Sequence, residues 1–438
     1  MSAAPARAPA GWLDELAWRG LLYQRTAGPE LDAHLAQPGR VGYCGFDPTA
    51  PSLTHGNLVP LTMLVHLQRA GHTPIALIGG GTGLIGDPSE RDAERPLLSP
   101  EQVEANVAGQ RRIFERLLDF DRARPNAARL LDNAEWLCRL GYVDLLRDVG
   151  KHFSVNSMIQ REAIRARLED REQGISYTEF SYGILQAYDF LHLHRELGCT
   201  VQASGSDQYG NVVAGIDLIH RTLGHRAEAY GVTAPLVTRS DGKKFSKSEG
   251  SAVWLTADRT SPYAFYQYWL NVPDDDAVRF LKIYTLLPRE EIDALAARHE
   301  AAPHERAAQR ALASELTTRL HGHTELERVQ LASEAVFGGG ELHAVDEAAL
   351  AQVVAELPQS IEPRASLAGE GTSLVDLLPR TTLASSKREA REFLRTGAVS
   401  VNGRRAEESA RLGEGDLLAG GVVLLRRGKK LWHATVWR

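Results

Sequence analysis

The sequence predicts an α/β fold in which a parallel-sheet domain is followed by an α-helical domain and a small α+β domain. In the first part of the chain, short apolar runs alternate with helical stretches and glycine-rich turns, a rhythm typical of parallel sheets. From 262 to 337 the pattern is almost wholly helical, with Ala-rich and Glu/Arg-rich faces. The last part contains two short helical stretches followed by short apolar runs, which indicate strands.

The expected elements of the first domain follow in chain order. Residues 13–24 (LDELAWRGLLYQ) have apolar side chains at helical spacing and predict an amphipathic helix. Three apolar runs predict strands, at 41–46, 74–78 and 199–203. Helices are expected at 58–70, ending at Gly71, and as charged stretches from 100 to about 197.

We expect domain boundaries where composition changes. The parallel-sheet domain is expected to cover 1–240, with a loop and connection over 241–260. The helical domain is expected over 261–340, because three glycines at 338–340 interrupt the pattern. A Pro- and Gly-containing stretch over 341–373 predicts a linker or a small subdomain. The α+β domain then covers 374–438, with strands near 399–401 and 422–425.

Composition excludes several classes of protein. With 43% hydrophobic and 24% charged residues, the 438-residue chain is typical of globular proteins and not of disordered or fibrous ones. No apolar run approaches the ~18 residues that a membrane span needs, and the first residues lack an apolar signal core. Cys44, Cys138 and Cys199 are too few and too widely spaced for a disulfide framework or a Cys-based zinc cluster. We expect a cytoplasmic protein without membrane contact.

The charge is unevenly distributed. Residues 381–438 hold 12 Lys and Arg against 6 Asp and Glu, whereas the whole chain has a net charge of −6. A basic end on an acidic body indicates nucleic acid or another acidic surface as its partner, although a solvated basic face is an equally good interpretation.

A glycine-rich segment after the second predicted strand matches the spacing of a dinucleotide-binding fingerprint, but the residues that follow it do not fit. Residues 81–86 read Gly-Thr-Gly-Leu-Ile-Gly, which matches G-x-G-x-x-G. That fingerprint needs a helix that continues beyond the third glycine, and Asp87-Pro88 opposes helix continuation. We favour a tight loop whose backbone approaches a ligand, with Asp87 directed into the site. A plain glycine turn is the alternative.

A second segment carries cations on a flexible loop. Lys244 and Lys247 lie three apart in a Gly- and Ser-rich context after Ser240-Asp241-Gly242. Two ammonium groups at this spacing suit a polyphosphate whose charge develops as it leaves. Taken alone, such a segment is more often a solvated surface loop.

Polar residues also gather where predicted strands end. The segment 43–58 runs from a strand end through a polar loop into a helix start, a place where free N–H groups bind anions. In it, Gly56 permits close approach of a flat ring, and Asn57 is a candidate either for chemistry or for capping the helix. The third strand is followed by Gly205-Ser206-Asp207-Gln208, where an acid is placed to accept ribose hydroxyls.

One helix face is unusually polar for its surroundings. Tyr182, Gln186 and Asp189 lie four and three residues apart and therefore share a face. This face suits a small polar ligand; a solvated face is the alternative, which Phe180 and Phe190 nearby make less favourable.

Six ordered segments together resemble class I aminoacyl-tRNA synthetases, and among these the bacterial tyrosyl-tRNA synthetases. The resemblance runs from Trp12 to about Lys430. It is carried by the segments YCGFDPTAPSL, GLIGDPSERDAER, VGKHFSVN, EFSYGILQAYDF, GSDQYGN and PLVTRSDGKKFSKS. It implies a Rossmann-like catalytic domain, a KMSKS-type loop over 241–260, an α-helical tRNA-binding domain and an S4-like RNA-binding domain.

The resemblance also implies roles for individual residues. Tyrosine is expected to be bound by Tyr43, Asp87, Tyr182, Gln186, Asp189 and Gln208, with Tyr43 and Asp189 at the phenol. ATP is expected at Cys44, Gly45, Asp47, Gly56, Gly205, Asp207, Lys244 and Lys247. Catalytic groups around the leaving pyrophosphate are Thr49, Thr54, Asn57, Arg91, Arg95, Lys244 and Lys247, with Thr54 and Asn57 at the two His positions of an H-x-G-H signature.

The implied activity is the ligation of tyrosine to tRNA(Tyr) with ATP as substrate and Mg²⁺ accompanying its phosphates; no protein-held metal is expected. For the basic end, the S4-like resemblance implies tRNA contacts by Lys387, Arg388, Arg391, Arg426, Arg427, Lys429 and Lys430. The resemblance further implies a homodimer.

Three departures from the family pattern lie near the expected nucleotide. Thr54 stands at the first signature His, with His55 one place later; Ser204 replaces a Gly, and Tyr209 replaces a Trp. A specialised second synthetase, a tryptophanyl-type relative, a biosynthetic amino-acid-activating relative and a weakly active paralogue with an RNA-binding role are therefore the alternatives. The acid at Asp189 favours a phenol-containing substrate over an indole.

Overall fold

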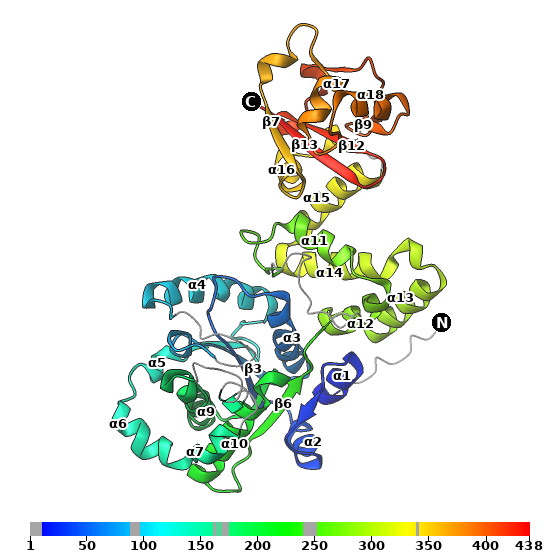
Figure 1. Cartoon of the computed structure of the whole chain (residues 1–438). Coiled ribbons are helices and arrows are strands. Elements are labelled where there is room, and N and C mark those ends of the chain that lie inside the picture. The colour runs from blue at the N-terminus through cyan, green and yellow to red at the C-terminus, as the bar shows by residue number, and fades with distance from the viewer. Residues whose placement is uncertain are drawn as a thin grey trace, which may run out of the picture. The chain divides into compact units, whose positions relative to one another are not determined.

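The structure is a computed structural model that describes residues 11–87, 97–160, 164–165, 168, 175–238, 240, 252–338 and 341–438. The chain divides into two units (Figure 1). The first comprises residues up to 259 together with 272–312, and the second comprises 260–271 and 313–438.

The first unit is built on a mostly parallel six-stranded sheet; the sequence predicts a parallel sheet and three of its strands, β2, β3 and β5, but not β1, β4 and β6. Its order is β1-β6-β5-β2-β3-β4, and all neighbours are parallel except β1, which runs antiparallel to β6. The strands are β1 (Gln24–Arg25), β2 (Val41–Phe46), β3 (Thr73–Ile78), β4 (Arg129–Asp132), β5 (Cys199–Gly205) and β6 (Tyr230–Ala234). Strand β3 is buried along its whole length, as expected for a parallel strand covered on both faces.

Helices cover both faces of this sheet. The helices of the first unit include α1 (Trp12–Arg19), α2 (Pro29–Leu35), α3 (His55–Arg69), α4 (Pro100–Leu117), α5 (Ala134–Leu137), α6 (Tyr142–Asp144), α7 (Val155–Ile159), α9 (Tyr177–Leu197), α10 (Tyr209–Leu223), α12 (Asp274–Tyr284) and α13 (Arg289–Ala301). Residues of β2 alternate between two sets of helices. Tyr43 packs with Phe190 of α9, whereas a side chain at Gly42 would meet Leu67 of α3. This alternation fixes the register of the central strand.

Several predicted boundaries need correction. Helix α1 ends at Arg19, not at residue 24, because Gly20 takes a left-handed conformation (φ 74°) that terminates a helix. Helix α3 begins at His55, three residues earlier than expected. The stretch from 100 to 197, expected as helical, also contains β4, a strand too short to be recognised from its four residues.

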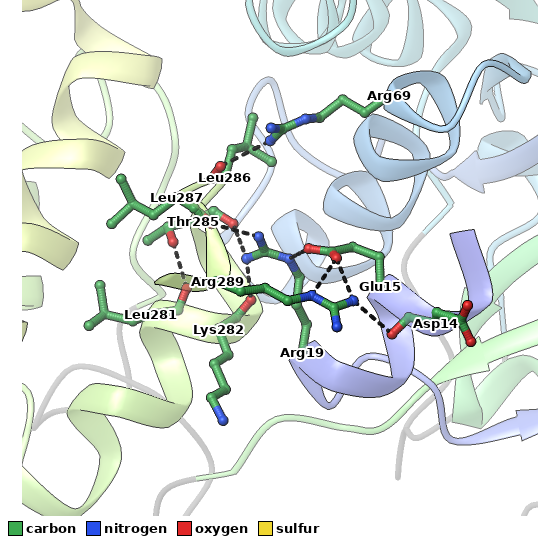
Figure 2. A network of polar contacts seen from close by, with 10 residues as sticks. All are labelled: Asp14, Glu15, Arg19, Arg69, Leu281, Lys282, Thr285, Leu286, Leu287 and Arg289. Atoms are coloured by element: carbon green, nitrogen blue, oxygen red, sulfur yellow. Dashed lines mark hydrogen bonds and ion pairs between the residues drawn. The ribbon is translucent and has the colours of Figure 1, made fainter. Parts of the chain in front are cut away.

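The connection between α12 and α13 is attached to α1 by buried charge (Figure 2). The Arg19 side chain is only 2% exposed. Its guanidinium donates to the carbonyl oxygen of Lys282 (2.9 Å), one of the groups that the end of α12 leaves unpaired, and to those of Thr285 (2.7 Å) and Leu287 (2.8 Å) just after the helix. Glu15 joins the cluster by accepting from Arg19 (2.6 Å) and Arg289 (2.7 Å). Burial raises the pKa of Glu15, but hydrogen bonds from Arg289 and Arg19 outweigh it, and the pKa lies below its ordinary value.

The second unit combines helices with a small sheet. Its helices are α11 (Pro262–Leu270), the larger part of α14 (Ala307–His321), α15 (His323–Ser333), α16 (Glu347–Ala355), α17 (Leu374–Leu377) and α18 (Lys387–Arg395). A five-stranded sheet of order β10-β9-β12-β13-β7 is formed by β7 (Gln359–Glu362), β9 (Val399–Val401), β10 (Arg404–Arg405), β12 (Val422–Arg427) and β13 (Leu431–Trp437). Strands β8 (Thr372–Ser373) and β11 (Arg411–Leu412) pair separately.

The stretch 341–373, expected as a linker or a small subdomain, contains regular structure. It contains α16, and its strand β7 pairs in parallel with β13 at the edge of the C-terminal sheet. Strand β7 (QSIE) carries polar side chains on a mostly exposed edge, so its sequence lacks the apolar run by which strands are recognised.

Candidate active site

A cavity of about 620 Å³ lies at the carboxyl ends of β2, β3 and β5. In open α/β sheets, ligands bind at this edge. The lining brings together every described residue that the sequence assigned to tyrosine, ATP or catalysis: Tyr43, Cys44, Gly45, Asp47, Thr49, Thr54, Gly56, Asn57, Asp87, Tyr182, Gln186, Asp189, Gly205, Asp207 and Gln208. The remaining candidates, Arg91, Arg95, Lys244 and Lys247, lie outside the described residues.

Asp189 is a buried acid held by two donors. It is 2% exposed on α9 and accepts hydrogen bonds from Asn133 Nδ2 (2.9 Å) and Trp136 Nε1 (2.7 Å). Both donors follow β4, and neither is among the residues predicted from sequence. Asn133 Oδ1 in turn accepts from the backbone N–H of Gly81 (2.7 Å), so this residue connects the glycine loop to Asp189. The signal in the sequence is the run Leu130-Leu131-Asp132-Asn133, a polar pair directly after two apolar residues.

Burial dominates the electrostatics around this acid. It raises the pKa of Asp189 to about 7, although the bonds from Asn133 and Trp136 favour the ionised form. Burial, followed by the charge of Asp189, raises the pKa of the Tyr43 phenol well above its ordinary value, so this phenol is a neutral donor. Among the described residues, the buried Tyr43 hydroxyl has no hydrogen-bond partner. A buried acceptor and a buried hydroxyl that has no partner among the described residues therefore both line the cavity.

Asp47 at the end of β2 is hydrogen-bonded both to α9 and to the loop after β3. The Tyr182 hydroxyl donates to Asp47 Oδ2 (2.9 Å) and Thr82 Oγ1 donates to Asp47 Oδ1 (2.8 Å). The resemblance assigns Asp47 to ATP and Tyr182 to tyrosine, and so implies separate places for these groups. In the structure they share one hydrogen bond.

Acceptor oxygens gather around Gln208. Its Nε2 donates to Asp87 Oδ2 (2.7 Å) and to Asp207 Oδ2 (2.9 Å), so one amide bridges two carboxylates. Burial raises the pKa of Asp207, and the bond from Gln208 opposes this shift. The Gln186 Oε1 atom is buried and receives no hydrogen bond from the described residues. This part of the cavity is suited to a ligand with several N–H or O–H donors, such as an ammonium group.

The loop after β3 has the geometry of a tight turn. Residues Thr82–Leu84 form a single 3-10 turn, and Gly86 has φ 87°, which an L side chain rarely adopts. The next α-helix, α4, begins only at Pro100. A dinucleotide fingerprint would need a helix running through the third glycine.

The first turn of α3 faces the cavity with a reciprocal cap. Thr54 is the N-cap, and its backbone N–H and hydroxyl both donate to Asn57 Oδ1 (3.0 and 2.9 Å). Capping, one of the two interpretations offered for Asn57, is therefore a role that it has in the structure. Residue His55 also lines the cavity, and its backbone N–H donates to the carbonyl of Val253 (3.0 Å).

The predicted tRNA-binding residues of the second unit differ in their surroundings. Arg388, Lys429 and Lys430 are exposed. Lys387 pairs with Asp376 (2.6 Å), and Arg391 lies 3.8 Å from Glu408.

Two further arginines of this set are partly buried against the sheet. The Arg426 guanidinium lies over the Trp432 ring, 5.1 Å from its centroid. Arg427 donates to the carbonyl of Leu383 (2.6 Å) and lies 4.5 Å from the centroid of Phe393. We expect these two arginines to contribute to packing at least as much as to a surface charge.

No helix among the described residues is long and apolar enough to cross a membrane.

Two family models match the chain, one after the other. Residues 39–338 match the class I tRNA synthetases (W and Y), and residues 352–435 match the tyrosine–tRNA ligase SYY-like C-terminal domain. The chain is 48% identical over 422 residues to a tyrosine–tRNA ligase of Roseiflexus castenholzii, a match that covers 96% of this chain and 98% of the relative. It is 49% identical over 421 residues to a tyrosine–tRNA ligase of Opitutus terrae, with coverage of 96% and 98%.

Solved structures with the same fold include two fungal mitochondrial proteins. A C-terminally truncated tyrosyl-tRNA synthetase of Coccidioides posadasii is 31% identical with a TM-score of 0.65, covering 73% of this chain and 91% of that protein. The corresponding truncated protein of Aspergillus nidulans is 28% identical with a TM-score of 0.67, covering 75% and 94%.

Proposed function

The chain belongs to the tyrosine–tRNA ligases of the class I tRNA synthetase family, and we propose a role for each part of its cavity in the reaction of such a ligase. The enzyme activates tyrosine with ATP and then transfers the tyrosyl group to tRNA. We treat Mg²⁺ as part of the nucleotide substrate, because phosphate oxygens and water are its usual ligands. Among the described residues, no group of three His, Cys, Asp or Glu side chains is placed to hold a metal ion.

We assign tyrosine specificity to the end of the cavity formed by the buried side chains of Asp189 and Tyr43. The substrate phenol donates to the Asp189 carboxylate and accepts from the Tyr43 hydroxyl, which has no other partner among the described residues. The observation that carries this proposal is the buried Asp189, held by Asn133 and Trp136 so that its remaining lone pairs are available. A site built to bond a hydroxyl rejects substrates that lack it, because its polar groups are then left unpaired.

The substrate ammonium is assigned to the acceptor-rich part of the cavity. Gln186 Oε1 and the Asp87 carboxylate are acceptors there, with Tyr182 and Gln208 beside them. This arrangement holds the α-carboxylate of tyrosine toward the ends of β2 and β5, where the nucleotide residues lie.

Adenylate formation needs positioning and charge stabilisation more than proton transfer. The tyrosine carboxylate oxygen attacks the α-phosphorus of ATP, and pyrophosphate leaves with its electron pair on a phosphate oxygen. Cys44, Gly45, Asp47, Gly56, Gly205 and Asp207 are assigned to the nucleotide. Thr49, Thr54, Asn57, Arg91, Arg95, Lys244 and Lys247 are assigned to the pyrophosphate.

In the second step, a hydroxyl of the terminal adenosine of tRNA attacks the tyrosyl carbonyl and AMP leaves. The exposed cations of the second unit, Arg388, Lys429 and Lys430, are assigned to tRNA phosphates. Because tRNA and ATP are the proposed substrates, we also propose that the enzyme acts in the cytoplasm.

ATP–pyrophosphate exchange with tyrosine, tryptophan and phenylalanine, followed by charging of tRNA(Tyr), tests the proposed function. We expect exchange that depends on tyrosine, together with charging. Exchange that prefers tryptophan would favour a tryptophanyl-type enzyme, exchange without charging a biosynthetic enzyme, and neither activity a paralogue that only binds RNA.

We further propose that the enzyme is a homodimer. Tyr142, Val143 and Leu146 are exposed apolar side chains, 60%, 72% and 43% exposed, on α6 and the π-helical segment that follows it. Tyr177, also 60% exposed, brings its hydroxyl to 3.4 Å from that of Tyr142. An apolar surface of this kind is typical of one that a second copy covers. Sedimentation should give a dimer for the parent chain and a monomer for Val143→Asp; a parent chain that is monomeric at micromolar concentration would contradict the proposal.

A further inference from the structure

We propose that Asp276, together with Arg279, is a positioning residue for the adenylation site. These residues lie on α12 and bond to Thr238 and Ser240, at the end of a segment whose residues Pro235, Leu236, Val237 and Thr238 line the cavity. The inference extends the proposed function, since it assigns a role in tyrosine activation to a helix outside the sheet.

Asp276 is a fully buried carboxylate (0% exposed) aimed at one short stretch of backbone. Its two oxygens accept from the backbone N–H of Ser240 at 3.2 and 3.1 Å, and Oδ2 also accepts from the Ser240 hydroxyl at 3.1 Å. Burying a carboxylate is costly unless it is paired and hydrogen-bonded. Here the compensating bonds go to Ser240 and Arg279, so the position of Ser240 is coupled to that of α12.

Arg279 completes the attachment. Its guanidinium pairs with Asp276 Oδ1 (2.7 Å) and also donates to the carbonyl oxygen of Thr238. A carboxylate and a guanidinium one helical turn apart thus bind a donor of Ser240 and an acceptor of Thr238. Two bonds of opposite polarity to neighbouring residues fix both the position and the direction of the backbone.

The segment held in this way borders the nucleotide side of the cavity. Strand β6 pairs with β5 so that Ala234 lies opposite Gly205. The chain that continues from Ala234 therefore passes beside the Gly205–Asp207 turn, and Pro235, Leu236, Val237 and Thr238 all line the cavity. The Asp189 end, assigned to the tyrosine phenol, is built from α9 and the residues after β4.

The same segment leads along the chain toward Lys244 and Lys247, which lie outside the described residues. After the two lysines, the chain is bonded to the residues around the start of α3. The backbone N–H of His55 donates to the carbonyl of Val253 (3.0 Å), and that of Leu255 donates to the carbonyl of Leu53 (2.9 Å). The chain on each side of the two lysines is thus attached to a fixed element.

Helix α12 is itself held at its opposite end. The Arg19 guanidinium donates to the carbonyl oxygens of Lys282 (2.9 Å) and Thr285 (2.7 Å), and Arg69 donates to that of Leu286 (3.0 Å) (Figure 2). Tyr284, in the last turn of α12, also lines the cavity. A helix fixed to α1 and α3 at its C-terminal end is a firm support for the contacts at its N-terminal end.

The test compares Asp276→Asn with Asp275→Asn in the full-length chain. Both residues lie in the first turn of α12, so either change removes one negative charge that favours the helix dipole. The Asp275 side chain is exposed, whereas that of Asp276 is buried against Ser240. The pair therefore separates the effect on the helix from the effect on the segment 235–240.

We expect Asp276→Asn to lower the rate of tyrosine-dependent pyrophosphate exchange by about 10- to 100-fold, the loss typical of a small misplacement of reacting groups. The dissociation constant for tyrosine, measured by equilibrium dialysis, should change by less than about twofold. Asp275→Asn should behave as the parent in both assays. A parallel loss of tyrosine binding, or equal rates for the two variants, would overturn the proposal.

A second measurement does not depend on activity. Hydrogen exchange of peptides that contain residues 235–240 should be faster in Asp276→Asn than in the parent and in Asp275→Asn. Unchanged exchange in this segment would overturn the positioning role even if activity were lost. If the parent chain shows no tyrosine-dependent pyrophosphate exchange while hydrogen exchange of this segment is still faster in Asp276→Asn than in the parent, the proposed function is refuted and the anchoring of the segment is retained.

Discussion

At the scale of single residues, we expect Asp189 to determine which amino acid the cavity accepts. Replacement by Asn keeps the volume but removes the charge that accepts the substrate hydroxyl. A hydrogen bond to a charged group contributes about 1.5–3 kcal/mol, so exchange with tyrosine should fall roughly 10- to 100-fold in kcat/KM. Exchange with phenylalanine, which makes no such bond, should change much less. Equal falls in kcat/KM for tyrosine and phenylalanine would contradict a role of Asp189 in specificity.

The raised pKa of Asp189 gives this prediction a pH dependence. Because burial places that pKa at about 7, the ionised fraction of the carboxyl increases as the pH rises from 6 to 8. The phenol of free tyrosine has a pKa of about 10 and stays neutral throughout this range. We expect kcat/KM for tyrosine to increase over the range in the parent and to be flatter in Asp189→Asn. Identical profiles would mean that another group titrates.

Sequence reasoning found Asp189 but not the residues that hold it. Asp189, Gln186 and Tyr182 are visible because helical spacing places three polar groups on one face. Asn133 and Trp136 reach the same site from the end of β4, a four-residue strand within a stretch that reads as helical. Their proximity to Asp189 depends on the pairing of β4 with β3, which only the folded sheet specifies.

At the scale of elements, β2, β3 and β5, the three central strands of the parallel sheet, are the most predictable part of the fold, whereas β4 and β6 at its sides are not predicted. The run Val41–Phe46 is a strand with the predicted bounds, because a buried parallel strand is a short apolar run between polar loops. The polar groups after β2, β3 and β5 meet in one cavity for the same reason, since carboxyl ends of parallel strands share an edge. Strand β7 cannot be recognised from its own polar sequence, because only its pairing with β13 in the folded sheet identifies it as a strand.

At the start of α3, residues that cap the helix are also proposed to act on the pyrophosphate. Thr54→Val removes the hydroxyl donor to Asn57 while keeping the shape of the side chain. A lost N-cap interaction costs about 1 kcal/mol of helix or protein stability. We therefore expect a slightly lower melting temperature together with slower pyrophosphate exchange.

Thr54→Ser, which retains the hydroxyl, is the matched control and should preserve both properties. If His55→Ala abolishes exchange while Thr54→Val leaves it unchanged, His55 and not Thr54 is the functional residue of this turn. The backbone bond from His55 to Val253 remains in every one of these variants, so the comparison reports on side chains.

At the scale of the whole molecule, the second unit determines where the chain can be shortened. Residue Gln352 of α16 accepts from the backbone N–H of Tyr263, and Gln267 of α11 donates to Ser333 of α15 (2.8 Å). Three helices from distant parts of the sequence therefore form one cluster. A chain that ends at 340 lacks α16 and exposes the apolar residues that it covers, whereas one that ends at 357 retains it.

We expect the chain that ends at 357 to keep tyrosine-dependent pyrophosphate exchange, because every residue assigned to tyrosine and ATP precedes residue 250. Charging of tRNA should fall steeply, since this truncation removes the basic segment 381–438 with its excess of six positive charges.

The parent should lose charging as salt is raised, because cations that neutralise phosphates release counterions on binding. The truncated chain should show a weaker dependence on salt. Melting curves would separate this effect from poor folding, which we expect for the chain that ends at 340. Normal charging by a folded chain that ends at 357 would contradict the role assigned to the basic segment.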